Sequence, residues 1–307
     1  MTDTAVVDPG GTADGGAPAG LVVTTGLTKR YGALVAVNDL HLTVPTGSIF
    51  GLIGPNGAGK STTFAMIAGL LRPTSGTLRV CGFDPGRDSR EVRRRLGYMP
   101  DVLGVYDNLR VDEYLEFFAA SYGIGRSHWP SLVEGLLELV ELSVKRTAMV
   151  NSLSRGMKQR LSLARALVHD PEFLILDEPA SGLDPRARVE LRDLLRSLNA
   201  MGKTIVISSH ILAELEEVCS DVAIMEAGKL LASGPPREIL QQLGGARTVR
   251  VRYADGLVET HTVADDAEQA ALLRRLCGDE GRDVVEFVEE SGGLEQLFLT
   301  ITKGIVQ

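Results

Sequence analysis

The sequence of 307 residues has no uninterrupted run of about 18 apolar residues, so no helix that spans a bilayer is expected from it. Its three cysteines, Cys81, Cys219 and Cys277, are too few and too widely spaced for a disulfide framework or a zinc site, and they predict a reducing compartment. The formal net charge of −8 argues against a general nucleic-acid-binding surface. Residues 1–20 lack the basic start and apolar core of a secretion signal, so we expect a disordered tail and an intracellular protein.

A phosphate-binding loop is the strongest motif that the sequence does contain. Residues 54–62 have the sequence GPNGAGKST, which fits G-x-x-x-x-G-K-[ST] at every position, and they lie between a strand-like run at 48–53 and a helix-forming run at 63–69. Glycines in such a loop let backbone N–H groups converge on a polyphosphate at a helix N-terminus. The alternative is a glycine-rich turn that only joins strand to helix. The predicted nucleotide-binding residues are Gly54, Pro55, Asn56, Gly57, Ala58, Gly59, Lys60, Ser61 and Thr62.

Two of these residues have a more specific expected role. Lys60 is expected to reach the β- and γ-phosphates, and we count it among the catalytic residues. The hydroxyl of Ser61 is expected to bind Mg²⁺.

Two acidic residues follow an apolar strand at 173–176. Because successive side chains on a strand point to opposite faces, Asp177 and Glu178 can have different roles at the same strand end. We expect Asp177 to hold Mg²⁺, directly or through water, and Glu178 to orient or deprotonate the attacking water. Such a pair is a weak indication alone, but together with a complete phosphate loop it favours nucleotide hydrolysis.

The pattern of elements predicts an α/β fold. Apolar strands at 173–176 and 204–208, with a helix at 186–199 between them, are typical of a parallel sheet covered on both faces. Short β-type runs between 21 and 44 predict antiparallel strands, and helical periodicity between 111 and about 141 predicts an inserted helical unit. We therefore predict a P-loop NTPase core with an antiparallel β subdomain and a helical subdomain, followed by a small C-terminal α+β domain.

Breaks in the pattern suggest the domain boundaries. We expect a disordered tail at 1–20, a nucleotide-binding domain at 21–240 and a C-terminal accessory domain at 241–307, with Pro235-Pro236 and Gly244-Gly245 near the boundary. The accessory domain is predicted to contain strands at 249–253 and 284–288, a helix at 267–276, and an amphipathic helix around 294–301.

These motifs and their order resemble the nucleotide-binding subunits of ABC transporters, over Leu21 to about Pro236. The resemblance includes the phosphate loop, residues 153–160 (LSRGMKQR, similar to LSGGQ), the acidic pair, residues 181–184 and His210. From its position alone, Tyr31 is an ordinary strand-end tyrosine, but the resemblance implies that it stacks on adenine. It also implies that His210 reaches the γ-phosphate. Ser154 and the Gly156 N–H, at a helix N-terminus, would bind the ATP of a second subunit, so a homodimer is implied.

Three residues depart from the usual family pattern. Asp101 stands where the family has a glutamine that contacts Mg²⁺, and its carboxylate can still offer oxygen to the metal. Arg155 and Met157 replace a glycine and a glutamine of the LSGGQ motif, and Arg155 is expected either to contact phosphate or to point to solvent. With these variants and its C-terminal appendix, the chain resembles the ATPases of ABC-2 type exporters.

The resemblance implies an ATP-binding and ATP-hydrolysing subunit, peripheral at the cytoplasmic face of the membrane, that powers a separately encoded exporter. Its expected partners are an integral membrane permease and a second copy of the chain, without nucleic acid. Residues 102–108 and the helix after them are the candidate docking surface for the permease. Two alternatives are a soluble ABC-type ATPase that acts on ribosomes or nucleic acid, and an importer ATPase. The first usually has both nucleotide-binding halves in one chain or a long coiled coil, and the second depends on a substrate-binding protein.

Overall fold

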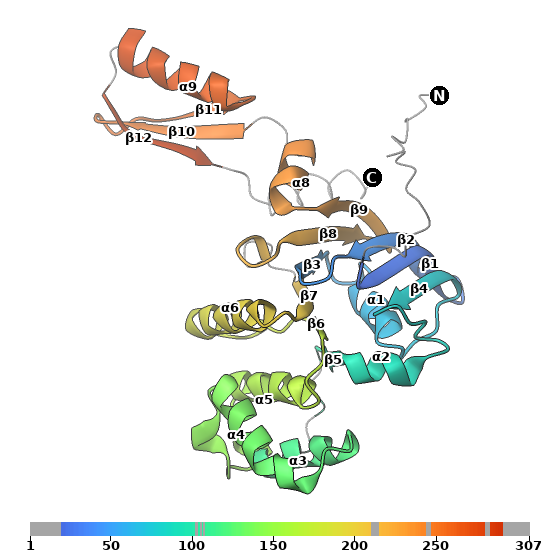
Figure 1. Cartoon of the computed structure of the whole chain (residues 1–307). Helices are drawn as coiled ribbons and strands as arrows, with labels where there is room; N and C mark the ends of the chain where they lie inside the picture. The colour runs from blue at the N-terminus through green and yellow to red at the C-terminus, as the bar shows by residue number, and fades with distance from the viewer. Residues whose placement is uncertain are drawn as a thin grey trace.

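The computed structural model describes residues 20–101, 104, 106, 108–209, 215–243, 247–279 and 283–290. Within these residues the strands form three sheets, which Figure 1 shows with the helices around them. The strand orders are β5-β6-β7-β3-β8-β9, β2-β1-β4 and β11-β10-β12. Residues 1–19 of the tail predicted at 1–20, the predicted helix around 294–301 and His210 lie outside the described residues.

The central sheet has six strands. β5 (Leu96–Met99), β6 (Phe173–Leu176), β7 (Thr204–Ser209), β3 (Ile49–Ile53) and β8 (Asp221–Glu226) are parallel, and β9 (Lys229–Gly234) pairs antiparallel with β8. All residues of β3 and β6 are buried. Ile49 and Ile53 pack into one hydrophobic cluster, and Phe50 and Leu52 pack into another. Apolar residues on both faces of the sheet explain why its strands are nearly continuous hydrophobic runs, as predicted.

The antiparallel sheet precedes and flanks the first helix. It contains β1 (Val22–Tyr31), β2 (Leu34–Val44) and β4 (Ser75–Val80). The apolar runs predicted as several short strands between 21 and 44 are parts of two long strands, which pair from Val22↔Val44 to Tyr31↔Leu34. Gly32, at φ 59°, allows the tight connection between them. Register shifts along this pair explain why the alternation of apolar residues looks interrupted in the sequence.

Helices cover the central sheet and form a separate helical unit. They are α1 (Lys60–Ile67), α2 (Ser89–Arg95), α3 (Val111–Ser121), α4 (Trp129–Leu139), α5 (Arg155–Leu167) and α6 (Pro185–Ala200). In Figure 1, α3, α4 and α5 lie together on the side of the molecule away from α1. Their packed faces include Tyr114, Leu115, Val133 and Leu137, all 1% exposed or less. The helical unit predicted between 111 and 141 is therefore present, and α5 packs against it.

The C-terminal part has its own sheet and its own hydrophobic cluster. After α8 (Pro236–Leu243), which crosses the expected boundary at 240, come β10 (Arg247–Tyr253), β11 (Val258–Val263), α9 (Asp266–Arg274) and β12 (Val284–Glu290). Val249, Val251 and Tyr253 of β10 pack with Leu272 and Leu276 in a small core. Strand β11 was not predicted, because VETHTV has too few apolar residues to indicate a strand.

The structure thus confirms the predicted α/β class, with an antiparallel sheet and a helical unit added to a parallel core. None of the described helices is long and apolar enough to cross a membrane.

Candidate nucleotide-binding site

The phosphate loop connects β3 to α1 and is held tightly at both ends. A Cβ atom on Gly54 would lie 2.4 Å from the carbonyl oxygen of Met225 in β8, and one on Gly59 would lie 2.4 Å from that of Ala36 in β2. Gly59 has φ 101° and precedes the first turn of α1, and Gly57 has φ 85°. At Gly59 only glycine combines this backbone angle with so close a contact, whereas Gly54 is required by the close contact alone and Gly57 by its backbone angle alone. The sequence of the loop therefore fixes a backbone cradle at a helix N-terminus, which is the geometry that binds a polyphosphate.

The side chain of Lys60 is folded against this loop. It is 6% exposed, and its ammonium group donates to the carbonyl oxygens of Gly54 (2.7 Å) and Pro55 (3.3 Å). Its Nζ also lies 3.7 Å from Oε1 of Glu178. The Lys60 ammonium is thus a buried cation with three N–H donors beside the loop, and these donors could bind phosphate oxygens in place of the carbonyl oxygens.

Asp177 lies at the end of β6, within reach of the first turn of α1. It is 3% exposed, and its Oδ1 accepts a hydrogen bond from Oγ of Ser208 at 2.6 Å. Burial raises the pKa of Asp177, while hydrogen bonds from the side chains of Ser208 and Ser61 act in the opposite direction. The structure thus brings the hydroxyl of Ser61 and the carboxylate of Asp177 together, as the sequence predicted for two oxygen ligands of one metal ion.

Glu178 follows in an unusual backbone conformation. Its φ is 51°, in the left-handed region that non-glycine residues rarely adopt. The conformation is held by three hydrogen bonds: its N–H donates to Oγ of Ser208 (2.8 Å), and its carbonyl accepts from Nε2 of Gln159 (3.2 Å) and the N–H of Ser181 (3.0 Å). These bonds turn the carboxylate, which is 14% exposed, toward Lys60.

Ser208, which was not identified from the sequence, links the two acidic residues. Its hydroxyl accepts from the backbone of Glu178 and donates to Asp177, and the residue is fully buried at the end of β7. In the sequence, the only indication of a role for Ser208 is its position as a polar residue at the end of an apolar strand. That position points to the acidic residues only once β7 is known to pair with β6, with Ile207 opposite Leu176.

Asp101 and Tyr31 lie at the edges of this arrangement. Asp101 lies two residues after the end of β5, and the carbonyl of Met99 in β5 accepts a hydrogen bond from the N–H of Asp177 at 2.8 Å. The charge of Asp101 also contributes to the raised pKa of Asp177, so the two carboxylates are near each other. Tyr31 ends β1, is 48% exposed, and has the ammonium of Lys29 at 5.2 Å from its ring centroid. An exposed aromatic ring is available there for stacking.

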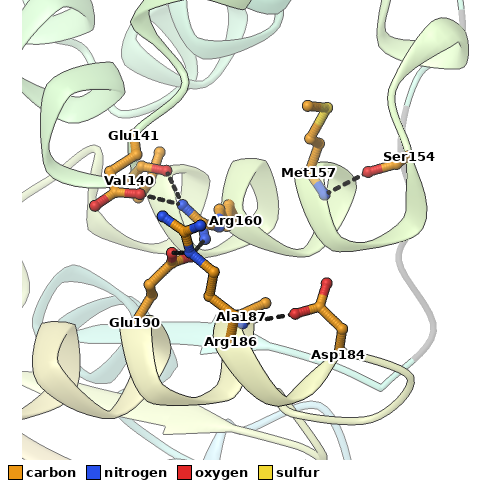
Figure 2. Close-up of polar contacts among 9 residues, drawn as sticks. All are labelled: Val140, Glu141, Ser154, Met157, Arg160, Asp184, Arg186, Ala187 and Glu190. Atoms are coloured by element: carbon orange, nitrogen blue, oxygen red, sulfur yellow. Dashed lines mark hydrogen bonds and ion pairs between the residues drawn. The ribbon is translucent and has the colours of Figure 1, made fainter.

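Ser154 and Gly156 lie at the start of α5, as predicted for a second anion site. Ser154 caps the helix and accepts from the N–H of Met157 at 3.3 Å. Beside it, Asp184 caps α6 and accepts from the N–H of Ala187 at 2.9 Å, so the two helix N-termini are neighbours (Figure 2). Helix α5, which begins after Ser154, and helix α1, which begins after the phosphate loop, lie in different parts of the molecule (Figure 1).

Arg155 contacts its own chain, which neither expectation for it anticipated. Its Nη2 donates to Oγ of Ser181 at 3.4 Å, although the side chain remains exposed. A Cβ atom on Gly182, whose φ is 72°, would lie 2.9 Å from Cζ of Arg155. The guanidinium group therefore covers the segment between Glu178 and α6.

The loop suits the phosphates of ATP, whereas the carboxylates and the serine hydroxyl suit a magnesium ion. The loop forms a backbone cradle at the N-terminus of α1. Among the described residues, no group of three or more His, Cys, Asp or Glu side chains could hold a metal ion by itself. Mg²⁺ prefers oxygen ligands and usually keeps phosphate and water oxygens among them, so one or two carboxylates and a hydroxyl are a suitable protein contribution.

Comparison with known proteins agrees with this geometry. The ABC transporter family profile matches residues 37–181. The chain is 38% identical over 296 residues to the Nod factor export ATP-binding protein I of Ralstonia nicotianae, covering 90% of this chain and 92% of that protein. It is 36% identical over 305 residues to the protein of the same name from Rhizobium meliloti, covering 94% and 90%.

Solved structures show the same fold. An ATP-binding subunit of an ABC transporter superposes with a TM-score of 0.67 and 32% identity, covering 73% of this chain and 93% of that one. A dimeric ATP-binding cassette in a post-hydrolysis state, bound to ADP and Pi, has a TM-score of 0.65 and 24% identity, covering 70% and 98%. This second likeness supports the fold alone.

The fold and the site therefore define a P-loop ATPase of the ATP-binding cassette type. The chain belongs to the ABC transporter family, as an ATP-binding subunit that hydrolyses ATP.

Proposed function

We propose that this chain powers a membrane exporter of the ABC-2 type, whose membrane-spanning part is a separate protein. The observation that carries the proposal is the similarity to export ATP-binding proteins, which extends over 90% of this chain and 92% of the Ralstonia protein. A match of that length includes residues beyond the ATP-binding cassette. We place the protein at the cytoplasmic face of the membrane, bound to its permease.

In the proposed mechanism, Lys60 binds the β- and γ-phosphates, and the loop N–H groups hold the phosphate chain. Ser61, Asp177 and Asp101 would hold Mg²⁺, which when bound neutralises charge on the phosphates. Tyr31 stacks on the adenine, and His210 contacts the γ-phosphate. Glu178 accepts the proton of the attacking water, for which its carboxylate must be free.

Without nucleotide, Lys60 forms an ion pair with Glu178. Their charged atoms lie 3.7 Å apart while Lys60 also donates to two loop carbonyls. A γ-phosphate carries more charge than one carboxylate and competes for the same ammonium group. ATP would therefore release Glu178 from Lys60.

A second copy of the chain is part of the proposal. One chain contains a phosphate loop at α1 and a capped N-terminus at α5 that lie in different parts of the molecule (Figure 1). A head-to-tail dimer would place Ser154 and the Gly156 N–H of one copy on the ATP held by the other. The dimeric cassette bound to ADP and Pi is a precedent for such an assembly in a protein of this fold.

An aromatic patch marks the surface that we propose for the permease. Tyr106 is 54% exposed and Phe117 is 47% exposed, with ring centroids 5.4 Å apart in an edge-on arrangement. Phe118 and Tyr114 continue the cluster inward at 5.3 Å from Phe117 and 5.1 Å from Phe118, respectively. Exposed aromatic rings on a packed base are typical of binding surfaces. Residues 102, 103, 105 and 107 of the predicted docking segment lie outside the described residues.

Replacing Tyr106 by Glu tests this surface. The change puts a charge into an apolar contact, so we expect transport in cells to fall at least about tenfold, a loss of about 1.4 kcal/mol. ATP turnover of the isolated subunit should stay within about twofold, because Tyr106 lies outside the nucleotide site. The control is Val144→Glu at a residue that is 90% exposed. Normal transport by the Tyr106 variant would contradict the docking assignment.

Co-purification tests the exporter assignment itself. Tagged Glu178→Gln protein is mixed with Mg·ATP in detergent extracts of native membranes, and bound proteins are identified. We expect a multi-span membrane protein in a two-to-two complex, and less of it with Lys60→Ala, which lacks the phosphate-binding ammonium. Glu238→Gln, an exposed substitution in α8, is the matched control. Recovery of ribosomes or nucleic acid without a membrane protein would instead support the soluble alternative.

A further inference from the structure

Ser208 lies at the edge of the central sheet where the phosphate loop and the acidic pair begin. It is the next-to-last residue of β7, which lies between β6 and β3. Its neighbour in β3 is Leu52, two residues before Gly54, while β6 on the other side ends at Leu176, directly before Asp177. Because the carboxyl ends of parallel strands meet at one edge of a sheet, the Ser208 side chain reaches both acidic residues.

The hydroxyl of Ser208 is a fully buried polar group with a hydrogen bond to each acidic residue. Its Oγ accepts from the N–H of Glu178 at 2.8 Å and donates to Oδ1 of Asp177 at 2.6 Å. A backbone N–H can only donate and a hydroxyl has a single proton, so with Asp177 ionised that proton points to its carboxylate. A buried hydroxyl destabilises the fold unless it is hydrogen-bonded, and these two bonds account for a serine in an apolar strand.

The bond from Glu178 to Ser208 fixes one of the two peptide planes that determine where the glutamate side chain points. Ser208 holds the plane before the Cα atom, through the N–H group. Gln159 and the N–H of Ser181 hold the plane after it, through the carbonyl oxygen. With both planes held, the Cα–Cβ direction is fixed, and the carboxylate lies 3.7 Å from Nζ of Lys60.

The backbone of Glu178 would not keep this conformation without help. A non-glycine residue at φ 51° has a higher free energy than in its ordinary regions, so it stays there only while its surroundings hold it. Without the Ser208 hydroxyl, the peptide plane between Asp177 and Glu178 loses this acceptor and can rotate. The Glu178 carboxylate would then move from its place near Lys60, and Oδ1 of Asp177 would lose a donor.

From these contacts we propose that Ser208 is a positioning residue for ATP hydrolysis. Its hydroxyl directs the Glu178 carboxylate through the backbone and holds the Asp177 carboxylate through the side chain, so that the two keep a fixed relation. Because Ser208 acts through these two residues, it affects kcat more than ATP binding, which is assigned to Lys60 and the phosphate loop. The inference rests on the proposed function, in which Glu178 is the base.

Ser208→Ala in the full-length protein removes the hydroxyl and both hydrogen bonds. We expect kcat for Mg·ATP to fall at least about tenfold. The Kd of ATP, measured without Mg²⁺ so that Asp177 does not contribute through the metal, should stay within about twofold, because Lys60 and the loop are unchanged. The control is Ser162→Ala, which removes a hydroxyl that is also buried but has no hydrogen-bond partner in the described part of the chain. It should change neither kcat nor Kd more than about twofold.

Ser208→Thr tests whether the hydroxyl itself is responsible. It restores the hydroxyl and adds one methyl group, and a cavity of about 80 Å³ that borders Ser208 and Ile207 has room for that methyl group. We expect its kcat to recover to within about threefold of the wild-type value. All variants are compared at a temperature at which calorimetry shows them to be folded, because the loss of buried hydrogen bonds lowers Tm. If Ser208→Thr does not fold, the comparison of Ser208→Ala with Ser162→Ala still decides.

A wild-type kcat for Ser208→Ala overturns the proposal. A fall in kcat with an equal loss of ATP affinity also overturns it, because a general disruption of the site would produce that result. So does a folded Ser208→Thr that is as slow as Ser208→Ala. Glu178→Gln is measured alongside: normal turnover of that variant overturns the proposed role of Glu178, whereas an inactive Glu178→Gln with a fully active Ser208→Ala overturns the role of Ser208 alone.

Discussion

At the scale of single residues, the site is a set of charges that the fold holds in costly positions. Lys60 and Glu178 pair at 3.7 Å in a largely buried place, and Glu178 adopts φ 51°. Asp177, 3% exposed, has its pKa raised by burial despite two hydrogen bonds. Buried charges and strained backbone angles reduce the stability of the folded protein, and they are typical of functional sites, where they contribute to binding or catalysis.

Replacing Asp177 by Asn should therefore stabilise the metal-free protein. A raised pKa means that the ionised carboxylate is less favourable in the folded state than in the unfolded state, at every pH above its usual value of about 3.9. The amide removes this cost, and its oxygen can still accept from Ser208. At pH 7 without nucleotide we expect a gain of about 1 kcal/mol, or about 2–4 °C in Tm, measured by calorimetry.

The same variant should lose Mg-dependent ATP turnover, because an amide is a poorer ligand for Mg²⁺ than a carboxylate. Glu238→Gln is the control for removing a negative charge and should change neither quantity appreciably. A lower Tm for Asp177→Asn would show that the carboxylate stabilises the fold, contrary to the account given above.

At the scale of elements, the connections between strands and helices fix the site. Gly54 and Gly59 pack against the backbones of β8 and β2, while Ser154 and Asp184 begin α5 and α6. Arg155 adds a link between these two helix starts through Ser181. The family pattern has a glycine at this position, so the link depends on this substitution.

A double-mutant cycle tests the link between Arg155 and Gly182. Gly182→Ala alone should cost about 1–2 kcal/mol, because φ 72° is unfavourable for alanine and its Cβ would meet the guanidinium. In an Arg155→Gly background there is no guanidinium for the new Cβ to meet. The loss of stability caused by Gly182→Ala should therefore be smaller by about 0.5 kcal/mol or more. Urea denaturation measures all four proteins. Strict additivity would show that the guanidinium does not contact Gly182 in solution.

Local motifs were predictable from the sequence, whereas contacts between distant segments were not. The loop at 54–62, the strand before Asp177 and the helical unit follow from residue order and periodicity, and the fold confirms these elements. Ser208 was missed because its role depends on the pairing of β6 with β7. The contact of Arg155 depends on the path of residues 181–182, which no local pattern encodes. The roles assigned to the site residues stay predictions, and His210 lies outside the described residues.

At the scale of the whole molecule, the described chain has three hydrophobic clusters, two in the ATPase part and one in the C-terminal sheet. The phosphate loop and the α5 N-terminus belong to different parts of the ATPase (Figure 1). In the proposed function, these are the two halves of a nucleotide site, so two chains must complete each other's sites.

The molecular mass of Glu178→Gln with and without Mg·ATP, measured by sedimentation velocity, tests this claim most directly. Without hydrolysis the ATP-bound pair should persist, so we predict a doubling of mass on adding Mg·ATP and no turnover. Adding Ser154→Arg to the same protein should restore the monomer, and Glu238→Gln alone should hydrolyse ATP normally. A Glu178→Gln protein that turns over ATP at the wild-type rate, or that binds Mg·ATP and stays monomeric, would contradict the prediction that two chains complete each other's sites.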